Sequence, residues 1–349
     1  MKNSYKVKNK FIMLVGLPGS GKTFLANQFL KEESMKTDKE NICLDENAGA
    51  SEALAETVVI QENAATPETV WISSDKIREE LYGSEDTQGD SSKVFELMRT
   101  RTQDALNEGK NVIYDACNIN SKKRTAFLNL LKKFQGEKIC VISATPYEEC
   151  VKRNAQRDRV VPEEVIKRMY TTWMTPYYFE GWDSIYIQYA DGARDSYGTP
   201  EEFVAKLMDY PHDNPHHTET VGLHMQMAHD YLLNHYDVKK EDNLAVAALL
   251  HDCGKPFTKA FCNKRGEPTE IAHYYQHQCN GAYDAMFFQY DGKSEKDILE
   301  ISMLINLHMI PFDWKEKKAE EKKQKLWGEE VYQKIRMIHE ADKASSIAE

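Results

Sequence analysis

The feature that most constrains the fold of this chain is the stretch GLPGSGKT at residues 16–23. It satisfies the pattern G-x-x-x-x-G-K-[ST] and follows the apolar run FIMLV. In such a loop the glycines let backbone N–H groups turn toward a phosphate, the lysine reaches the β and γ oxygens, and the hydroxyl binds Mg²⁺. The stretch therefore predicts a strand, a phosphate-binding loop and a helix that together bind ATP and Mg²⁺. The predicted contact residues are Gly16, Gly19, Ser20, Gly21, Lys22 and Thr23.

Strand-like and helix-like segments alternate after this loop. Short apolar runs occur as TVWIS, NVIYD, KICVISA and SIYIQY, with helical patterns between them. This alternation predicts an α/β P-loop domain over residues 1–195, with a parallel sheet covered by helices. An acidic, alanine-rich stretch at about residues 32–69 lacks the pattern, and we expect it to be an insertion in this domain.

The pattern changes between residues 195 and 210. Helical periodicity dominates from there on, and all eleven histidines lie beyond residue 210. A chain of 349 residues is long enough for two domains that each bury a core. We therefore predict a second, all-α domain over residues 205–349.

Composition limits the class of protein. The net charge of −11 argues mildly against broad, non-specific binding to nucleic acid, although it permits a local basic groove. Seven scattered cysteines without a CxxC pair suit reduced thiols, which predicts a cytoplasmic protein. Because no apolar run is long enough to span a bilayer, we expect no membrane partner.

The stretch ISSDKIR bears on the acceptor of the phosphoryl group. Asp75 follows a predicted strand, where α/β sheets place their ligands, and could take the proton from an attacking hydroxyl. Arg78 would share its side of a helix and could bind a substrate phosphate, although the two could also form a surface ion pair. Asp115 ends another predicted strand and could orient Mg²⁺ through water or serve as a cap.

The stretch CVKRNAQRDR places Arg153 and Arg157 four residues apart, with Arg159 beyond them. On one face of a helix, such arginines could close over a triphosphate and offset charge as the phosphoryl group leaves. A solvated basic face is the alternative.

Together these motifs resemble the polynucleotide 5′-kinase family of P-loop phosphotransferases. The resemblance covers roughly residues 10–190 and rests on GLPGSGKT, SSDKIR, NINSKKR and VKRNAQRDRVVPEEVIKRMY. It implies that Asp75 is the general base, that Arg78 binds the acceptor's phosphate and that Arg157 is the lid arginine. Arg153 would be a further lid contact. Two departures leave the acceptor open: compact members lack the insertion, and the residues around Asp75 differ from the family's usual polar pair.

A different chemistry is indicated by the stretch AALLHDCGKP. His251 and Asp252 end an apolar helical pattern and can both point at one metal. His224 lies in another helical pattern, and Asp342 lies near the C-terminus. His273 and His277 are spaced as on one face of a helix. Imidazole and carboxylate ligands suit Mn²⁺, Ni²⁺, Co²⁺ and similar ions better than a thiolate zinc site would.

This ordered series resembles the HD phosphohydrolase superfamily over about residues 212–349, with the nearest likeness to the HD domain attached to tRNA nucleotidyltransferases. The resemblance implies that His224, His251, Asp252 and Asp342 are the primary metal ligands. The residues that would bind a second metal or substrate phosphate are His273, His277, His308 and Lys255.

The two halves together predict a bifunctional enzyme that heals nucleic-acid ends, of RNA more than of DNA. One half would phosphorylate a 5′-hydroxyl and the other would hydrolyse a 3′-phosphate or 2′,3′-cyclic phosphate, so that a separate ligase could follow. One alternative is a nucleoside or nucleotide kinase fused to an HD nucleotidase. A third possibility is a regulatory module that binds ATP and only senses a nucleotide through its second half.

Overall fold

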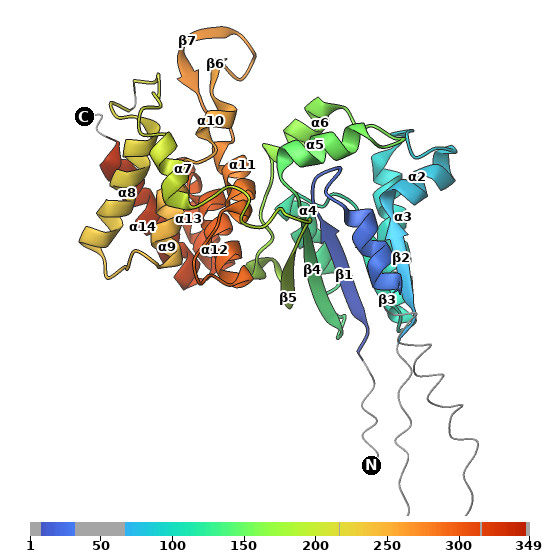
Figure 1. The fold of residues 1–349 in the computed structure, drawn as a ribbon. Coiled ribbons are helices and arrows are strands. Elements are labelled where there is room, and N and C mark those ends of the chain that lie inside the picture. The colour runs from blue at the N-terminus through green and yellow to red at the C-terminus, as the bar shows by residue number, and fades with distance from the viewer. Residues whose placement is uncertain (1–7, 32–66, 216, 315, 347–349) are drawn as a thin grey trace, which may run out of the picture.

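The computed structural model describes residues 8–31, 67–215, 217–314 and 316–346. It has two lobes, one built on a sheet and one mainly of helices (Figure 1). The predicted insertion at 32–69 falls almost entirely on residues 32–66, which lie outside the described residues.

The first lobe is organised by a five-stranded sheet in the order β2-β3-β1-β4-β5, in which every neighbouring pair is parallel. This confirms the predicted parallel sheet. The register places Asp115 opposite both Leu14 and Ser73, so three carboxyl-terminal strand ends lie side by side. The strands are β1 (Lys10–Val15), β2 (Thr69–Ser73), β3 (Asn111–Asp115), β4 (Glu137–Ala144) and β5 (Ser184–Tyr189).

Helices cover both faces of this sheet, as buried strand residues with alternating side chains require (Figure 1). On one face, Leu14 and Ile113 pack against the helix of residues 22–31. On the other face, Phe11 stacks on Phe127, with ring centroids 5.2 Å apart. The remaining elements of this lobe are α2 (Ser74–Tyr82), α3 (Ser91–Asn107), α4 (Ser121–Leu130), α5 (Tyr147–Ala155), α6 (Glu163–Tyr170) and η1 (Tyr178–Glu180).

The second lobe is helical, and α8, α9, α12 and α14 pack against one another in its centre. The helix α7 packs on α8 and α9, while the predicted domain boundary near 195–210 stays a prediction. The helices are α7 (Pro200–Lys206), α8 (Val221–His235), α9 (Asn243–Leu250), α10 (Lys255–Thr258), α11 (His277–Asp284), η2 (Ala285–Phe287), α12 (Glu295–Leu307), η3 (Ile310–Asp313), α13 (Lys317–Trp327) and α14 (Glu329–Ser345).

The all-α prediction for this lobe is wrong at one place. β6 (Ala260–Cys262) and β7 (Pro268–His273) form an antiparallel hairpin that projects from the top of the lobe in Figure 1. Its turn contains Gly266 at a φ of +82°, a conformation that glycine adopts without steric cost. The expected helical face that joins His273 to His277 therefore does not exist, because His273 ends β7 whereas His277 begins α11.

The two lobes share one continuous hydrophobic core, which runs from the sheet into the helical lobe. Buried hydrogen bonds reinforce the contact between the lobes. The Tyr283 hydroxyl donates to the carbonyl of Thr145 at 2.6 Å, and the Asn306 side-chain amide donates to the carbonyl of Trp173 at 3.0 Å.

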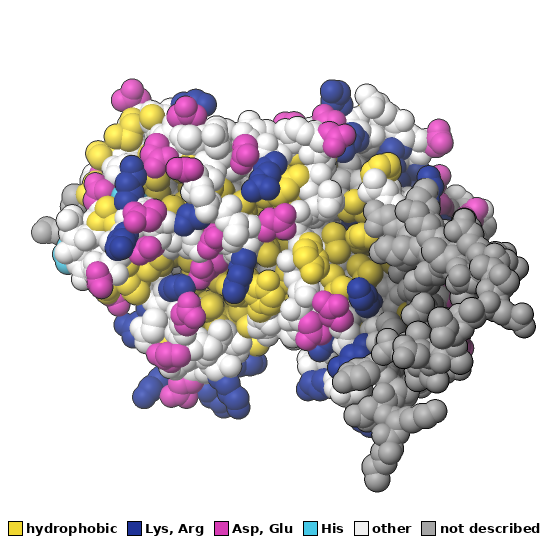
Figure 2. Space-filling model, turned by 60° about the horizontal axis from the view of Figure 1, so that its bottom comes forward, with side chains coloured by type: hydrophobic (Ala, Val, Ile, Leu, Met, Phe, Trp, Pro, Cys, Tyr) yellow, Lys and Arg dark blue, Asp and Glu magenta, His cyan; other side chains and the backbone are white. Residues whose placement is uncertain are grey.

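On the face drawn in Figure 2, acidic and basic side chains are interspersed.

Candidate active sites

The phosphate-binding loop is held against the end of β4. The carbonyl of Ser20 accepts hydrogen bonds from the hydroxyls of Ser143 at 2.7 Å and Thr145 at 2.9 Å. Gly19 has a φ of +82°, and a Cβ there would lie 2.3 Å from the carbonyl oxygen of Cys150. A Cβ at Gly16 would lie 2.9 Å from the carbonyl oxygen of Ser143. Both positions therefore require glycine.

Lys22 and Asp115 lie close together at the mouth of this loop. The Lys22 ammonium donates to the carbonyl of Leu17 at 2.8 Å. Burial raises the pKa of Asp115, against the opposing effects of the Lys22 charge and of a hydrogen bond from the Trp71 indole at 3.3 Å. Thr23 is exposed in the first turn of the helix of residues 22–31. Carboxylate and hydroxyl oxygens are ligands that suit Mg²⁺, and the roles of Asp115 and Thr23 as its ligands stay predictions.

Asp75 lies at the beginning of α2, just beyond the end of β2. The Ser73 hydroxyl caps this helix by accepting from the Asp75 backbone N–H at 3.3 Å. The Asp75 atom Oδ1 contacts Arg78 at 3.0 Å and Arg159 at 2.8 Å. Arg159 also contacts Asp86 at 3.3 Å. Two guanidinium groups therefore converge on the carboxylate that the sequence singles out as a general base.

Arg159 was not among the predicted site residues, because its contact with Asp75 depends on how the segment after α5 folds back over α2. The only sequence signal was its place at the end of the basic stretch that contains Arg153 and Arg157.

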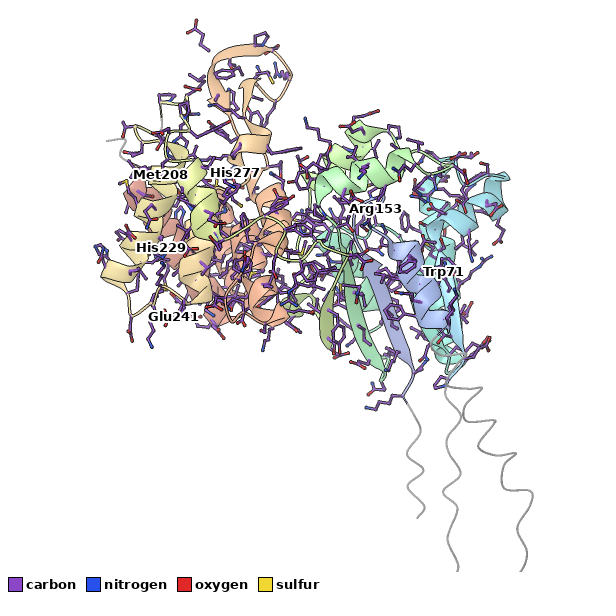
Figure 3. All side chains as sticks on the ribbon, in the orientation of Figure 1. Trp71, Arg153, Met208, His229, Glu241 and His277 are labelled. Atoms are coloured by element: carbon purple, nitrogen blue, oxygen red, sulfur yellow. The ribbon has the colours of Figure 1, made fainter. Side chains whose placement is uncertain are left out.

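The expected helical face with Arg153 and Arg157 is wrong. α5 ends at Ala155, so Arg157 lies beyond the helix, where it is exposed. Arg153 stays within α5 and pairs with Glu149 at 2.8 Å, on the upper side of the first lobe (Figure 3). Arg157 does act on the site electrostatically, since its charge lowers the pKa of Asp115.

The second lobe contains a buried cluster of imidazole and carboxylate groups. The Nε2 atom of His224 lies 3.1 Å from His251 Nε2 and 3.1 Å from Asp342 Oδ1. Asp252 adjoins this group, with Oδ2 3.4 Å from His224 Nε2 and 3.3 Å from His251 Nε2. The structure thus brings together four residues from α8, α14 and the end of α9, as the sequence predicts.

A second group adjoins the first through Asp252. Its Oδ1 lies 3.1 Å from His277 Nε2, which in turn lies 3.3 Å from His308 Nε2. His277 begins α11, and His308 follows the end of α12. Among the described residues, His273 belongs to neither group.

The orientation of three imidazoles is determined by the backbone. The Nδ1 atoms of His251, His277 and His308 lie 2.7–2.8 Å from the carbonyl oxygens of the residues three positions earlier. Each Nδ1 therefore carries a proton, and each Nε2 faces the cluster. His224 Nδ1 has no hydrogen-bond partner among the described residues.

Electrostatics make this cluster attractive to a cation. Burial opposes a charge on His251, but the Asp252 and Asp342 carboxylates outweigh it and raise the pKa of His251 to about 10. Burial and the neighbouring His251 and His277 lower the pKa of His308 to about 3, so its Nε2 stays available as a ligand. His251 therefore holds a proton that a bound cation would displace, and the converging imidazoles and carboxylates would then fit a divalent transition-metal ion.

Lys255 links the cluster to two histidines that the sequence did not single out. Its ammonium lies 2.6 Å from Asp252 Oδ2, 3.0 Å from His212 Nε2 and 3.4 Å from His217 Nε2. Burial and the Lys255 charge lower the pKa of His212 to about 4. His212 is therefore neutral, donates through Nδ1 to the carbonyl of Glu219 at 2.7 Å, and accepts from Lys255. His212 and His217 were missed because they lie in a loop without helical spacing.

Comparison with known proteins places the first lobe. A family model described as an AAA domain matches residues 53–176, which is less than half of the chain and begins after the phosphate-binding loop. A curated relative, L-seryl-tRNA(Sec) kinase of Methanococcus maripaludis, is 28% identical over 172 residues, which cover 49% of this chain and 55% of the relative. The first lobe is a P-loop kinase-like domain. ATP and Mg²⁺ are the typical cofactors of such a domain.

The chain spans about half the length of this relative. Two solved structures, titled "Structure of Pnkp1/Rnl/Hen1 complex" and "Structure of the Pnkp1/Rnl/Hen1 RNA repair complex", are 19% and 18% identical. The match to the first structure covers 46% of this chain and 43% of the chain in that structure, with a TM-score of 0.30. The match to the second structure covers 49% of this chain and 46% of the chain in that structure, with a TM-score of 0.32. Scores this low do not establish a shared arrangement. In the part of the chain that the structure describes, no helix is long and apolar enough to cross a membrane.

Proposed function

We propose that this chain remodels both ends of a broken polynucleotide. The P-loop lobe phosphorylates a 5′-hydroxyl with ATP, and the helical lobe hydrolyses a 3′-phosphate or 2′,3′-cyclic phosphate. The observation that carries the proposal is the presence, in one chain, of a phosphate-binding loop and Asp75 at the same edge of the sheet and of a converged imidazole–carboxylate cluster. The first group suits phosphoryl transfer to a hydroxyl, and the second suits phosphoester hydrolysis.

RNA is the preferred substrate in this proposal. A 2′,3′-cyclic phosphate forms only where a 2′-hydroxyl is present. The curated relative is named for a substrate attached to tRNA, which supports an RNA-linked hydroxyl as acceptor. A separate ligase that requires a 5′-phosphate and a free 3′-hydroxyl would then act on the healed ends.

The kinase step assigns a role to each group of the first site. Asp75 takes the proton from the 5′-hydroxyl as its oxygen attacks the γ-phosphorus, and the bond to the β–γ bridging oxygen of ATP breaks to release ADP. Lys22 and the loop N–H groups stabilise the charge on the transferring phosphoryl group. Arg78 binds a phosphate of the acceptor, and Arg153 and Arg157 contribute positive charge above the triphosphate.

The hydrolytic step rests on the second site. His224, His251, Asp252 and Asp342 would hold a divalent ion such as Mn²⁺, Ni²⁺ or Co²⁺. A bound ion of this kind supplies positive charge and acidifies water. The Lys255 ammonium, held beside Asp252, contacts the oxygens of the phosphoester. His277 and His308, which adjoin Asp252, are the residues proposed for a second ion or for further phosphate contacts, whereas His273 lies in neither group.

The experiment that tests this proposal uses a short RNA with a 5′-hydroxyl and a 2′,3′-cyclic phosphate. The purified chain is incubated with it, ATP, Mg²⁺ and Mn²⁺, and the masses of both ends are measured. A gained 5′-phosphate together with a lost 3′-terminal phosphate is the expected result. Unchanged ends, with turnover of free nucleosides or nucleotides instead, would contradict it.

That second outcome corresponds to a second candidate, a nucleoside or nucleotide kinase joined to a nucleotidase. The net charge of −11 favours it, because an acidic protein gains little from non-specific attraction to nucleic acid. A cytoplasmic location is part of either proposal and is supported by the six described cysteines, all of which are free.

A further inference from the structure

A cavity of about 510 Å³ opens above the imidazole–carboxylate cluster. Asp252, His277 and Asp342 reach its floor from the cluster. A phosphoryl group alone is far smaller than this cavity, so the cavity has room for a larger part of a substrate. The remaining lining residues used below are Lys255, Tyr275, Phe312 and Lys343.

One side of the rim carries Tyr275. His273, two residues earlier in the chain, stacks on Tyr275, with ring centroids 5.2 Å apart and planes 8° apart. The Lys264 ammonium lies 5.3 Å from the centre of the Tyr275 ring. The next residue, Gln276, has a φ of +66°, a conformation that is unfavourable for a residue with a side chain. Because of this turn, the Tyr275 side chain lines the cavity whereas the His277 side chain contacts Asp252 in the cluster.

Phe312 also lines the cavity. Its side chain is 48% exposed although the ring is large and apolar. His339 contacts it edge-on, with centroids 4.3 Å apart and planes at 83°, so the ring is supported from one direction. Phe312 lies in η3, shortly after His308. Both aromatic residues therefore flank the cluster on segments adjacent to its own ligating histidines.

Positive charge accompanies these rings. Lys255 lies at the floor and Lys343 lies in the lining, and Lys264 stands over Tyr275. Flat aromatic faces beside ammonium groups are the combination by which proteins hold unpaired bases and the backbone phosphates between them.

We propose that this cavity takes the phosphorylated 3′ end of a single-stranded polynucleotide, with the terminal bases stacked on Tyr275 and Phe312. The inference rests on the proposed function and narrows it to a substrate class for the helical lobe. The terminal phosphate lies at the floor beside Lys255, and Lys343 contacts the phosphate of the preceding nucleotide. The bases are read by stacking, so the site accepts different sequences.

Binding is measured first, with EDTA present so that hydrolysis does not contribute. The probe is a short RNA with a 3′-phosphate and 2-aminopurine as its terminal base, whose fluorescence falls on stacking. We expect quenching with the unchanged protein. Tyr275→Ala and Phe312→Ala should each weaken binding about 5- to 150-fold and reduce the quenching. Phe312→Trp should retain both. Tyr186→Ala is the matched control, since Tyr186 is 52% exposed on β5 of the other lobe.

Hydrolysis with Mn²⁺ then separates this inference from the proposed function. The same variants should lower activity on the oligonucleotide more than activity on p-nitrophenyl phosphate. If the unchanged protein hydrolyses neither substrate, the proposed function fails. If it hydrolyses both and the variants bind the oligonucleotide normally, only the stacking inference is overturned. Equal affinity for a 3′-mononucleotide and for the oligonucleotide would show that the cavity takes a free nucleotide instead.

Discussion

Two guanidinium groups on one carboxylate are the most informative contact of the kinase-like lobe. Arg78 reaches Asp75 from one turn further along α2, at a spacing visible in the sequence. Arg159 reaches the same oxygen from the segment after α5 and also contacts Asp86. Through these two contacts, Arg159 holds the basic stretch at residues 150–159 against Asp75 and Asp86. Substitution of Arg159 should therefore increase the mobility of that stretch and leave the phosphate-binding loop unchanged.

Asp75→Asn should abolish phosphorylation and leave hydrolysis intact. An amide cannot take the proton from the attacking hydroxyl, so the rate of phosphoryl transfer should fall about 10²- to 10⁴-fold. Transfer of labelled phosphate to a 5′-hydroxyl oligonucleotide measures it, with Asp191→Asn, at an exposed position after β5, as control. Loss of both activities in a folded variant would contradict the separation of the two sites.

Among the described residues, Asp252 is the one carboxylate that adjoins both groups of the imidazole–carboxylate cluster. Asp252→Ala should abolish hydrolysis and preserve phosphorylation. It should also remove the thermal stabilisation that Mn²⁺ gives the unchanged protein, which is about 2.7 kcal/mol at a concentration one hundred times Kd. Thermal unfolding with and without Mn²⁺ measures this, and Asp237→Ala, at an exposed position of the same lobe, is the control. An equal Mn²⁺ shift in both variants would place the ion elsewhere.

At the scale of elements, α11 joins the second cluster to the kinase-like lobe. It begins with His277 in the cluster and ends with Asp284, whose carboxylate accepts a hydrogen bond from the Tyr170 hydroxyl of α6 at 2.5 Å. Tyr170 in turn stacks on Tyr147 of α5, with centroids 4.5 Å apart. The helix α5, which carries Arg153, therefore packs through Tyr147 and Tyr170 on the helix that positions His277.

The burial of Asp284 at this contact should make the stability of the protein depend on pH. Burial raises the pKa of Asp284 from 3.8 to about 8, against the hydrogen bond from Tyr170. The folded protein thus keeps a proton that the unfolded chain has lost, so the contribution to stability is full below the unfolded pKa of 3.8 and is lost as pH rises toward about 8. Asp284→Asn does not titrate and should therefore gain stability relative to the unchanged protein between pH 5 and pH 8.

Thermal unfolding of both proteins across that range measures the effect, with Asp291→Asn at an exposed nearby position as control. A difference in Tm that stays constant with pH would show that Asp284 is ionised in the folded protein.

At the scale of the whole molecule, the two lobes should unfold together. Their hydrophobic core is continuous, and the buried side chain of Asn306 bridges them. It donates to the carbonyl of Trp173 at 3.0 Å and accepts from the backbone N–H of Thr175 at 3.2 Å. A shared core and buried polar bridges couple the lobes more firmly than a flexible linker would.

Asn306→Ala should lower the stability of both lobes at once. It leaves the Thr175 N–H and the Trp173 carbonyl without these partners, at a cost of about 1–3 kcal/mol for each buried group that stays unpaired. Calorimetry should show a single transition lowered by several degrees, whereas Asn234→Ala at an exposed position of α8 should change little. Two transitions, only one of which moves, would show that the lobes unfold independently.

Local pattern alone was enough to predict the parallel sheet, the phosphate-binding loop and the succession of helices in the second lobe. Strand and helix periodicities are properties of short segments, and the loop requires glycines at fixed spacing, as the geometry at Gly16 and Gly19 shows. The histidines and aspartates of the imidazole–carboxylate cluster could also be picked out from the sequence. Their order along the chain identified them, although their separations in sequence do not show that they meet in space.

Tertiary structure decided the remainder. The contact of Arg159 with Asp75, the ring of His212 beside Lys255 and the hairpin that separates His273 from His277 all join residues through the packing of other elements. Arg153 turned to Glu149, a nearer partner on its own helix. Sequence spacing determines which side chains can meet within one helix, whereas the meeting of side chains from different elements depends on how a shared core packs them together.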